Sequence, residues 1–302
     1  MTFNIETYLN SLPENTEKIN VSNKNIHYLP DLTRFKNLKS VYCEYNKLTF
    51  LPSLNETLQK LYCGYNQLTT LPPLNDKLQE LFCYYNILTC LPELNKKLEI
   101  LYCNNNQLSV LPSLNANLHE LFCSNNNLTY LPYLNEKLYL LYCSYNKLIS
   151  LPVLNKNLEK LSCFKNKLTF LPTLNLNLII LNCDCNQLTT LPLLNKKLEI
   201  LHCNNNQLTS LFLLNENLNI FNYKDNPIYE IINSDDKYII NQKLKILNNF
   251  RYLYYCLKFK KQFRDWLWVK IREPKIRQKY SYEYLVANLH ENTDLDELLD
   301  NW

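Results

Sequence analysis

The middle of this chain repeats itself every 20 residues. Cys43 recurs at this step as far as Cys203, and Asn46 recurs as far as Asn226. Most copies read Leu-Tyr-Cys-x-x-Asn-x-Leu-Thr-x-Leu-Pro-x-Leu-Asn or a close variant. A copy of this length cannot bury its own leucines, so successive copies must stack and share one core. The period therefore predicts an elongated repeat protein with a stacked binding surface, and it argues against a catalytic pocket.

Each copy contains signals for a strand, a turn and an extended return leg. In the copy that begins at Leu58, Leu61 and Cys63 alternate as in a short strand with one face inward. We expect the amide of Asn66 to bond backbone groups of its own turn and of the neighbouring copy. Pro72 excludes a regular helix from the return leg. The predicted fold is a solenoid with a parallel β-sheet on its concave face and an extended or polyproline-like convex face.

The repeat pattern divides the chain into three parts. Residues 19–228 hold about eleven coils, counted from Ile19 to Phe221 at the strand position. Residues 1–18 are expected to form an N-terminal cap with a short helix around Phe3–Leu9. Residues 229–302 lie beyond the period and are predicted to form a helical C-terminal cap.

Nine of the twelve cysteines occupy one inward position of the repeat. Free cysteine behaves there as a small buried hydrophobe. A straight column of thiols does not converge on one ion, so we expect neither a metal nor a cofactor. Reduced, buried thiols indicate an intracellular protein.

The repeat resembles a known class. Its spacing and its Leu-Thr-x-Leu-Pro-x-Leu return leg are similar to the short bacterial leucine-rich repeat, as in enterobacterial type III secreted effectors. The chain departs from that class at Asn55, Asn75 and their successors, where the class usually has a second proline. The resemblance covers residues 19–228. It implies a leucine-rich repeat solenoid and does not identify a partner.

Aromatic residues gather at the outward positions of the predicted sheet. The residue between the strand leucine and the cysteine is aromatic in six consecutive copies, and more aromatics follow two and three positions later. We call the set the concave aromatic stripe: Tyr42, Tyr45, Tyr62, Tyr65, Phe82, Tyr84, Tyr85, Tyr102, Phe122, Tyr142 and Tyr145.

Two interpretations of the stripe stand side by side. Aromatics favour strands and stabilise one another across them. Exposed aromatics are also typical of protein interaction hot spots. The change to Ser162, Asn182 and His202 after Tyr142 favours a bounded patch that binds a protein. Stacking of unpaired bases is the alternative, but the concave face supplies few cations.

The C-terminal module has helical spacing of apolar residues from Tyr238 to Arg272, and Pro274 is expected to end the helix. Further helices are expected after Ser281 and Thr293. Residues 243–280 carry twelve Lys or Arg against two acids, a net charge of +10. Residues 281–302 carry six acids and no Lys or Arg, a net charge of −6.

This division of charge has two interpretations. The acidic tail folds back onto the basic helices and caps the solenoid, or the basic helices bind nucleic acid or an acidic membrane. For the second interpretation we define the basic C-terminal surface as Lys258, Lys260, Lys261, Arg264, Lys270 and Arg272.

The C-terminal module also carries a resemblance. The runs Lys258-Phe-Lys-Lys-Gln-Phe-Arg-Asp-Trp-Leu-Trp and Asp294-Leu-Asp-Glu-Leu-Leu-x-Asn-Trp closely resemble the C-terminal block of leucine-rich repeat proteins from mimivirus-like giant DNA viruses. With the repeats, this resemblance covers nearly the whole chain. It implies a viral origin, a location in the host-cell cytoplasm or the virion, and a viral or host protein as partner. A virion structural protein is a further alternative.

No feature of the sequence predicts an enzyme. The four histidines fall at unrelated repeat positions, and a single glycine excludes a glycine-rich phosphate loop. Asp184, Cys185 and His202 are the one nearby grouping of acid, nucleophile and base types. Residues 1–20 lack a secretory signal, and no apolar run reaches the roughly 18 residues that span a bilayer. We expect a monomeric, non-enzymatic protein.

Overall fold

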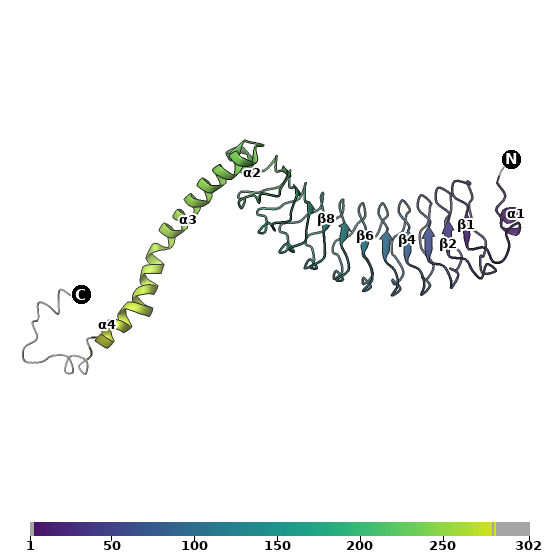
Figure 1. Ribbon diagram of the computed structural model, residues 1–302, viewed down its shortest axis with the longest axis horizontal. Coiled ribbons are helices and arrows are strands. Elements are labelled where there is room, and N and C mark those ends of the chain that lie inside the picture. The colour runs from purple at the N-terminus through teal and green to yellow at the C-terminus, as the bar shows by residue number, and fades with distance from the viewer. Residues whose placement is uncertain (1–2, 280, 282–302) are drawn as a thin grey trace, which may run out of the picture. The chain divides into compact units, whose positions relative to one another are not determined.

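A computed structural model describes residues 3–279 and residue 281. The described chain contains one sheet of eleven parallel strands that follow one another in sequence order (Figure 1). The chain divides into two compact units, Met1–Leu244 and Lys245–Trp302. The predicted leucine-rich repeat solenoid is confirmed by this topology.

Each strand is three residues long; β2 starts 22 residues after β1, and every later strand starts 20 residues after the previous one. Successive strands pair in register, so that Leu61 lies opposite Leu81 and Tyr62 opposite Phe82. From β2 to β7 only the middle side chain of each strand is buried. The strands are β1 (Lys18–Asn20), β2 (Ser40–Tyr42), β3 (Lys60–Tyr62), β4 (Glu80–Phe82), β5 (Ile100–Tyr102), β6 (Glu120–Phe122), β7 (Leu140–Tyr142), β8 (Lys160–Ser162), β9 (Ile180–Asn182), β10 (Ile200–His202) and β11 (Ile220–Asn222).

The core consists of columns of identical side chains. Leu61, Cys63 and Leu68, like their equivalents in the other coils, are almost fully buried. The nine repeat cysteines are free and buried, as predicted, whereas Cys90 and Cys185 are exposed. Burial raises the pKa of the Cys83 and Cys163 thiols to about 12, because a thiolate is poorly solvated in the core. These thiols are therefore packing groups with little reactivity.

The predicted asparagine ladder lies at the turn after each strand. The side-chain amide of Asn86 donates hydrogen bonds to the carbonyl oxygens of Cys63 and Cys83, both at 3.1 Å. Its Oδ1 accepts a hydrogen bond from the backbone N–H of Leu68 at 2.9 Å. One asparagine thus satisfies backbone groups in two coils where the sheet has ended.

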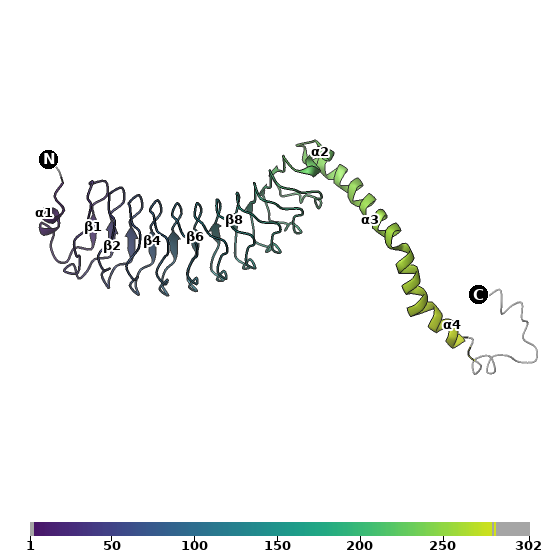
Figure 2. The same cartoon turned by 180° about the vertical axis from the view of Figure 1, so that it is seen from behind.

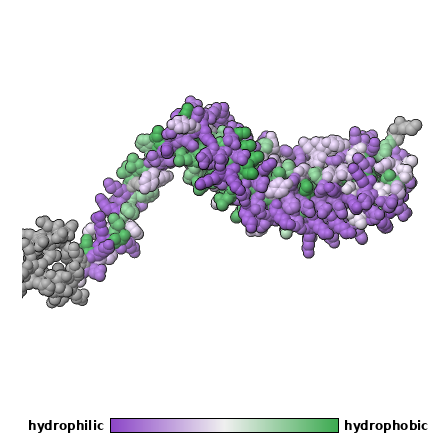
Figure 3. All heavy atoms as spheres, viewed as in Figure 1, coloured by the Kyte–Doolittle hydropathy of each residue, from purple (hydrophilic) through white to green (hydrophobic). Residues whose placement is uncertain are grey.

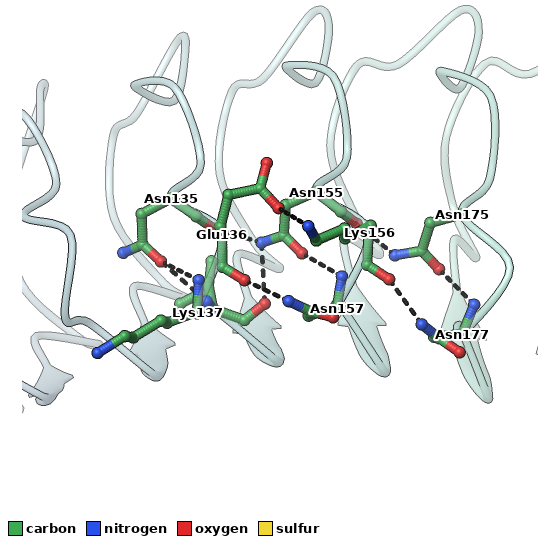
Figure 4. Close-up of polar contacts among 9 residues, drawn as sticks. Asn135, Glu136, Lys137, Asn155, Lys156, Asn157, Asn175 and Asn177 are labelled. Atoms are coloured by element: carbon green, nitrogen blue, oxygen red, sulfur yellow. Dashed lines mark hydrogen bonds and ion pairs between the residues drawn. The ribbon is translucent and has the colours of Figure 1, made fainter.

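A second asparagine ladder crosses the convex side (Figure 4). The amide of Asn155 donates to the carbonyl oxygens of Asn135 at 2.6 Å and Leu138 at 2.9 Å, and its Oδ1 accepts from the N–H of Asn157. The return legs contain turns and extended segments without helix or strand. The position where the bacterial class has a second proline is therefore a hydrogen-bonded link between neighbouring coils.

The N-terminal end of the solenoid is covered by a short helix. Helix α1 (Ile5–Asn10) begins at Asn4, whose Oδ1 accepts a hydrogen bond from the Thr7 N–H at 2.9 Å. Ile5 and Leu9 of this helix are buried. The expected helix around Phe3–Leu9 is thus present.

The other end is covered by α2 (Pro227–Ile232) and by the first turns of α3 (Lys237–Leu267) (Figure 2). The apolar side chains that these turns bury are Ile228, Ile232, Ile240 and Leu244. Asn241 accepts from the N–H of Leu214 at 2.8 Å and donates to its carbonyl oxygen at 3.1 Å. These helices cap the last coil. The acidic tail that was expected to fold back as a cap lies outside the described residues, apart from Ser281.

In the second unit the helical course continues past Pro274. After α3 come a π-helical turn, η1 (Trp268–Arg272), and α4 (Glu273–Lys279). The expectation that Pro274 ends the helix is wrong. The wider π turn bonds the Glu273 N–H to the Trp268 carbonyl oxygen, and Pro274 then occupies the first turn of α4, where proline is tolerated. The helices expected after Ser281 and Thr293 lie outside the described part of the chain.

Candidate interaction surface on the sheet

The first file of the concave aromatic stripe is a continuous row of rings in contact, stacked at both ends and tilted by 57° and 40° on either side of Tyr102. The rings of Tyr42 and Tyr62 are 4.6 Å apart at an angle of 12°, and those of Tyr62 and Phe82 are 4.4 Å apart at 8°. The file continues through Tyr102, Phe122 and Tyr142 with centroid distances of 4.1–4.6 Å. Each ring is partly exposed. The distance between neighbouring strands therefore brings neighbouring rings into contact. These contacts stabilise the sheet, and the rings still face outward.

Carboxylates hold two of the four phenol groups of this file in place, those of Tyr62 and Tyr102. The Tyr62 hydroxyl donates to Glu80 at 2.6 Å, and the Tyr102 hydroxyl donates to Glu120 at 2.7 Å. Glu80 also forms an ion pair with Lys60 at 2.8 Å. Partial burial and the bond to Glu80 raise the pKa of Tyr62 well above its usual value. The ring positions are thus fixed before any partner binds.

A second file of rings lies at the turn after the strands. Tyr45, Tyr65 and Tyr85 form a stack with both centroid distances at 4.3 Å. Each has left-handed backbone, with φ of 55°, 52° and 51°. A side chain in this conformation costs about 1–2 kcal/mol, and asparagine tolerates it best. Tyr45 is 53% exposed and Tyr85 is 45% exposed, so the rings sit on the surface rather than in the core.

The aromatic stripe also contains a ring-over-glycine contact at Gly64 that the sequence analysis did not predict. Gly64 is the single glycine of the chain. A β-carbon added there would lie 3.0–3.2 Å from three atoms of the Tyr84 ring. The ring therefore lies flat over the Gly64 backbone, and its hydroxyl donates to Glu44 at 2.7 Å. One side chain spans three coils.

A file of aliphatic side chains on the sheet was also missed. Ile180, Ile200 and Ile220 occupy neighbouring strands in register, and Ile220 is 44% exposed. The third residue of each of these strands, which occupies the same position as the first file of rings, is polar: Asn182, His202 and Asn222. The expected change from aromatic to polar holds at that position. The aliphatic file comes from the other outward position, the first residue of each strand, which lies two residues earlier in the sequence.

A polar strand separates the aromatic and aliphatic regions. β8 carries the partly exposed Lys160 and the buried Ser162, whose hydroxyl lies 2.9 Å from that of Ser144. The concave face therefore has an aromatic half over β2–β7 and an aliphatic half over β9–β11.

Two lysines of the chain lie over rings of the stripe. The Lys18 Nζ is 4.6 Å from the ring centroid of Tyr42, and the Lys165 Nζ is 4.6 Å from that of Tyr145. Phe164 meets the same Tyr145 ring edge-on at 4.7 Å. The aromatic faces at both ends of the stripe thus attract cations.

No hydrogen bond joins the side chains of Asp184 and His202. Asp184 accepts a hydrogen bond from the Asn204 N–H at 2.6 Å, and the His202 Nδ1 lies 2.8 Å from the Asn222 amide. Cys185 is exposed. Burial raises the pKa of Asp184. The hydrogen bonds of the acid and of the base thus go to different asparagines, and none joins the acid to the base.

Within residues 3–279 and 281, no three His, Cys, Asp or Glu side chains are placed to hold a metal ion. None of the helices in this range is long and apolar enough to cross a membrane.

The basic C-terminal surface lies on α3 and η1, and all six of its cations are exposed. Apolar residues of α3, among them Phe250, Phe263 and Trp266, are exposed as well. Figure 3 shows hydrophobic and hydrophilic residues interspersed along this helix. Lys258 lies 5.8 Å from the ring of Tyr254 and 5.6 Å from that of Phe259. The helix thus exposes cations and rings together, without a purely basic face.

Comparisons with known proteins agree with the fold. The chain is similar to the structure of YopM from Yersinia enterocolitica, with 35% identity and a TM-score of 0.67 over 70% of this chain and 47% of that one. It therefore spans about half the length of that protein. No protein-family model matches the chain, and a comparison with curated proteins found no match.

Two further structures share the architecture at lower identity. One is the octameric complex of latrophilin 3, Unc5D and the repeat domain of FLRT2, with 24% identity and a TM-score of 0.60 over 72% of this chain and 77% of that one. The other is the Drosophila Toll–Spätzle complex, with 22% identity and a TM-score of 0.55 over 69% of this chain and 34% of that one. These likenesses show the fold alone.

Proposed function

The chain is a leucine-rich repeat protein with a period of about 20 residues, and we propose that it is a non-enzymatic scaffold that binds a partner protein through the concave aromatic stripe. The partner is a viral or a host protein. The stripe offers stacked, partly exposed rings whose orientation is fixed by hydrogen bonds. Rigid tyrosines supply contact area with little loss of conformational entropy on binding.

The observation that carries this proposal is the left-handed backbone of Tyr45, Tyr65 and Tyr85. The equivalent residues Asn105 and Asn125 have the same backbone conformation, with φ of 56° and 54°. Asparagine would thus fit the fold at less cost. Lys165 and Cys185 share this backbone as single exceptions outside the stripe, whereas three consecutive coils here carry a tyrosine and stack their rings. Strain that is repeated in a stacked file of rings supports a binding role.

The structural neighbours support the same class of function at a coarser level. Two of them are assemblies of proteins, a latrophilin 3–Unc5D–FLRT2 complex and a Toll–Spätzle complex. A stacked concave sheet supplies an extended surface of the kind used for protein recognition. For this chain, the identity of the partner and the monomeric state remain part of the proposal.

The experiment exchanges the strained tyrosines for the residue that the fold itself uses at that position. Tyr45→Asn and Tyr85→Asn together should abolish capture of the partner from infected or host cells and leave the circular dichroism spectrum unchanged. The matched control is Cys185→Asn, a change at the same left-handed position of a coil outside the stripe. If the double variant captured the same protein as the control, the stripe would be structural only.

We further propose an origin in a giant DNA virus and a location in the host-cell cytoplasm or the virion. The C-terminal runs that begin at Lys258 and Asp294 support this origin. Measuring whether the protein is packaged in purified virions separates an intracellular scaffold from a virion structural protein.

A second candidate function is tethering to nucleic acid or to an acidic membrane through the basic C-terminal surface. The exposure of all six cations supports it. Binding should then weaken steeply with salt and disappear when Lys258, Lys260, Lys261 and Arg264 are replaced by glutamine. Binding that does not respond to salt would exclude this tether.

A further inference from the structure

The arrangement of Glu44, Gly64 and Tyr84 forms a flat aromatic platform with a carboxylate at one end. The Tyr84 ring covers Gly64, so one of its faces is in contact with the backbone. The opposite face is therefore turned away from the strand. The hydroxyl points at Glu44, 40 residues earlier in the sequence, and bonds its Oε1 at 2.7 Å.

Glu44 has no oppositely charged partner among the described residues. Its side chain is partly buried, and its hydrogen bond comes from the neutral phenol of Tyr84. Among residues 3–279 and 281, Glu44 forms no ion pair, whereas Glu80 on the same face is paired with Lys60. A partly desolvated carboxylate beside an aromatic face favours a cation at that place.

The chain itself shows what such a face attracts. At the far end of the stripe, Tyr145 and Phe164 meet at 76°, and Lys165 places its Nζ 4.6 Å above the Tyr145 ring. Tyr65 and Tyr84 stand in the same register relationship and meet at 88°. The third member is Tyr85 in place of a lysine. Here Tyr85 stacks on Tyr65 at 4.3 Å, in the place where Lys165 lies over Tyr145. Tyr84 corresponds to Phe164, and among residues 3–279 and 281 no lysine or arginine lies over its ring.

We propose that the Tyr84 ring and the Glu44 carboxylate together bind the side chain of an arginine on the partner protein. A guanidinium can stack on an aromatic face and at the same time donate hydrogen bonds, within its own plane, to a carboxylate. An ammonium can donate to the carboxylate but has no flat face to stack on the ring. The carboxylate repels phosphates, so the site is unsuited to nucleic acid. This inference rests on the proposed function, since the arginine belongs to the protein that occupies the concave face.

The test titrates the full-length protein, with labelled tyrosine rings, with N-acetyl-arginine amide and follows the ring signals by NMR. N-acetyl-citrulline amide is the matched probe, because it has nearly the same shape without the charge. The Tyr84 signal is assigned by its loss in Tyr84→Phe. We expect the arginine probe to shift the Tyr84 signal with millimolar affinity and the citrulline probe to bind about tenfold more weakly, a ratio that corresponds to ~1.4 kcal/mol.

Three variants locate the site. Glu44→Gln should weaken the arginine probe about tenfold, to the level of citrulline. Gly64→Ala should displace the Tyr84 ring and abolish the shift; the backbone accepts a side chain there, since Ser124 and Ser144 occupy the same register position. Glu120→Gln is the control, because Glu120 also accepts a phenol hydrogen bond on this face but lies outside the platform. It should leave the shift intact.

The outcomes separate this inference from the proposed function. Equal affinities for arginine and citrulline, or an arginine affinity that Glu44→Gln leaves unchanged, would overturn the arginine site even if the stripe variants lose their partner. If the arginine probe binds as expected while the stripe variants keep their partner, the proposed function fails and the site remains a cation site of unassigned use. In a captured partner, the decisive arginine is the one whose change to lysine reproduces the effect of Glu44→Gln.

Discussion

Lys237 at the start of α3 donates a hydrogen bond to the carbonyl oxygen of Glu216 at 2.7 Å. The same contact recurs one and three periods earlier, where Asn217 donates to Lys196 and Asn177 donates to Lys156, both at 2.8 Å. The first residue of the capping helix therefore continues the convex hydrogen-bond file of the repeats. The C-terminal cap thus continues the hydrogen-bond pattern of the repeats, although the sequence repeat has ended before it.

Replacing Lys237 with methionine should lower the free energy of unfolding by about 1 kcal/mol, because the carbonyl oxygens of Glu216 and Leu218 lose their donor. The measurement is urea unfolding followed by circular dichroism. Lys224→Met is the control, since the ion pair of Lys224 with Asp235 is exposed and should change stability by less than ~0.5 kcal/mol. Equal effects of the two changes would contradict a capping role.

Asn86→Ala should destabilise the solenoid by about 3 kcal/mol. The change leaves the N–H of Leu68 and the carbonyl oxygens of Cys63 and Cys83 without their side-chain partner inside the protein. Gln67→Ala, at an exposed position of the preceding coil, should be nearly neutral. A neutral Asn86→Ala would mean that water replaces the ladder.

Alkaline pH should unfold the protein through its cysteine column. The folded-state pKa of Cys83 and Cys163 is raised to about 12, above the ordinary value of 9.0. Their contribution to stability is therefore present below pH 9 and is lost as the pH rises towards 12. Between these values each thiol should remove about 1.4 kcal/mol per pH unit.

The measurement is the slope of unfolding free energy against pH between 9 and 11, in wild type and in the Cys83→Ala/Cys163→Ala variant. The slope should fall by about 2.8 kcal/mol per pH unit, the sum for two thiols. Cys90→Ala is the control, because that thiol is exposed and should leave the slope unchanged. An unaltered slope in the double variant would show that the column does not control alkaline unfolding.

Cys185→Gly should stabilise the protein by about 1 kcal/mol, since Cys185 has left-handed backbone with φ of 53° and an exposed side chain. Thermal unfolding measures the gain. Cys90→Gly, at an exposed position without a positive φ, should instead be neutral or destabilising. A loss of stability in Cys185→Gly would show that the thiol makes a contribution larger than the strain.

The period alone predicted the inward half of the molecule. A 20-residue step with leucine, cysteine and asparagine at fixed places leaves one way to bury them, so the parallel sheet, the cysteine column and the inner ladder followed from the sequence. The path past Pro274 did not, because a single π turn depends on local hydrogen bonds that no residue pattern announces. The aliphatic file could have been predicted from Ile180, Ile200 and Ile220, because these residues occupy the first of the two outward positions of each strand.

The outward half was decided by tertiary structure. The sequence determined that Tyr84 and Glu44 both face outward, but not that one bonds the other across the single glycine between them, because a contact that skips a coil depends on how closely the strands stack. The sequence likewise placed Tyr45, Tyr65 and Tyr85 in one file, while only the backbone revealed their left-handed conformation. Periodicity fixes which side chains share a face, and the packing of neighbouring coils then decides which of them touch.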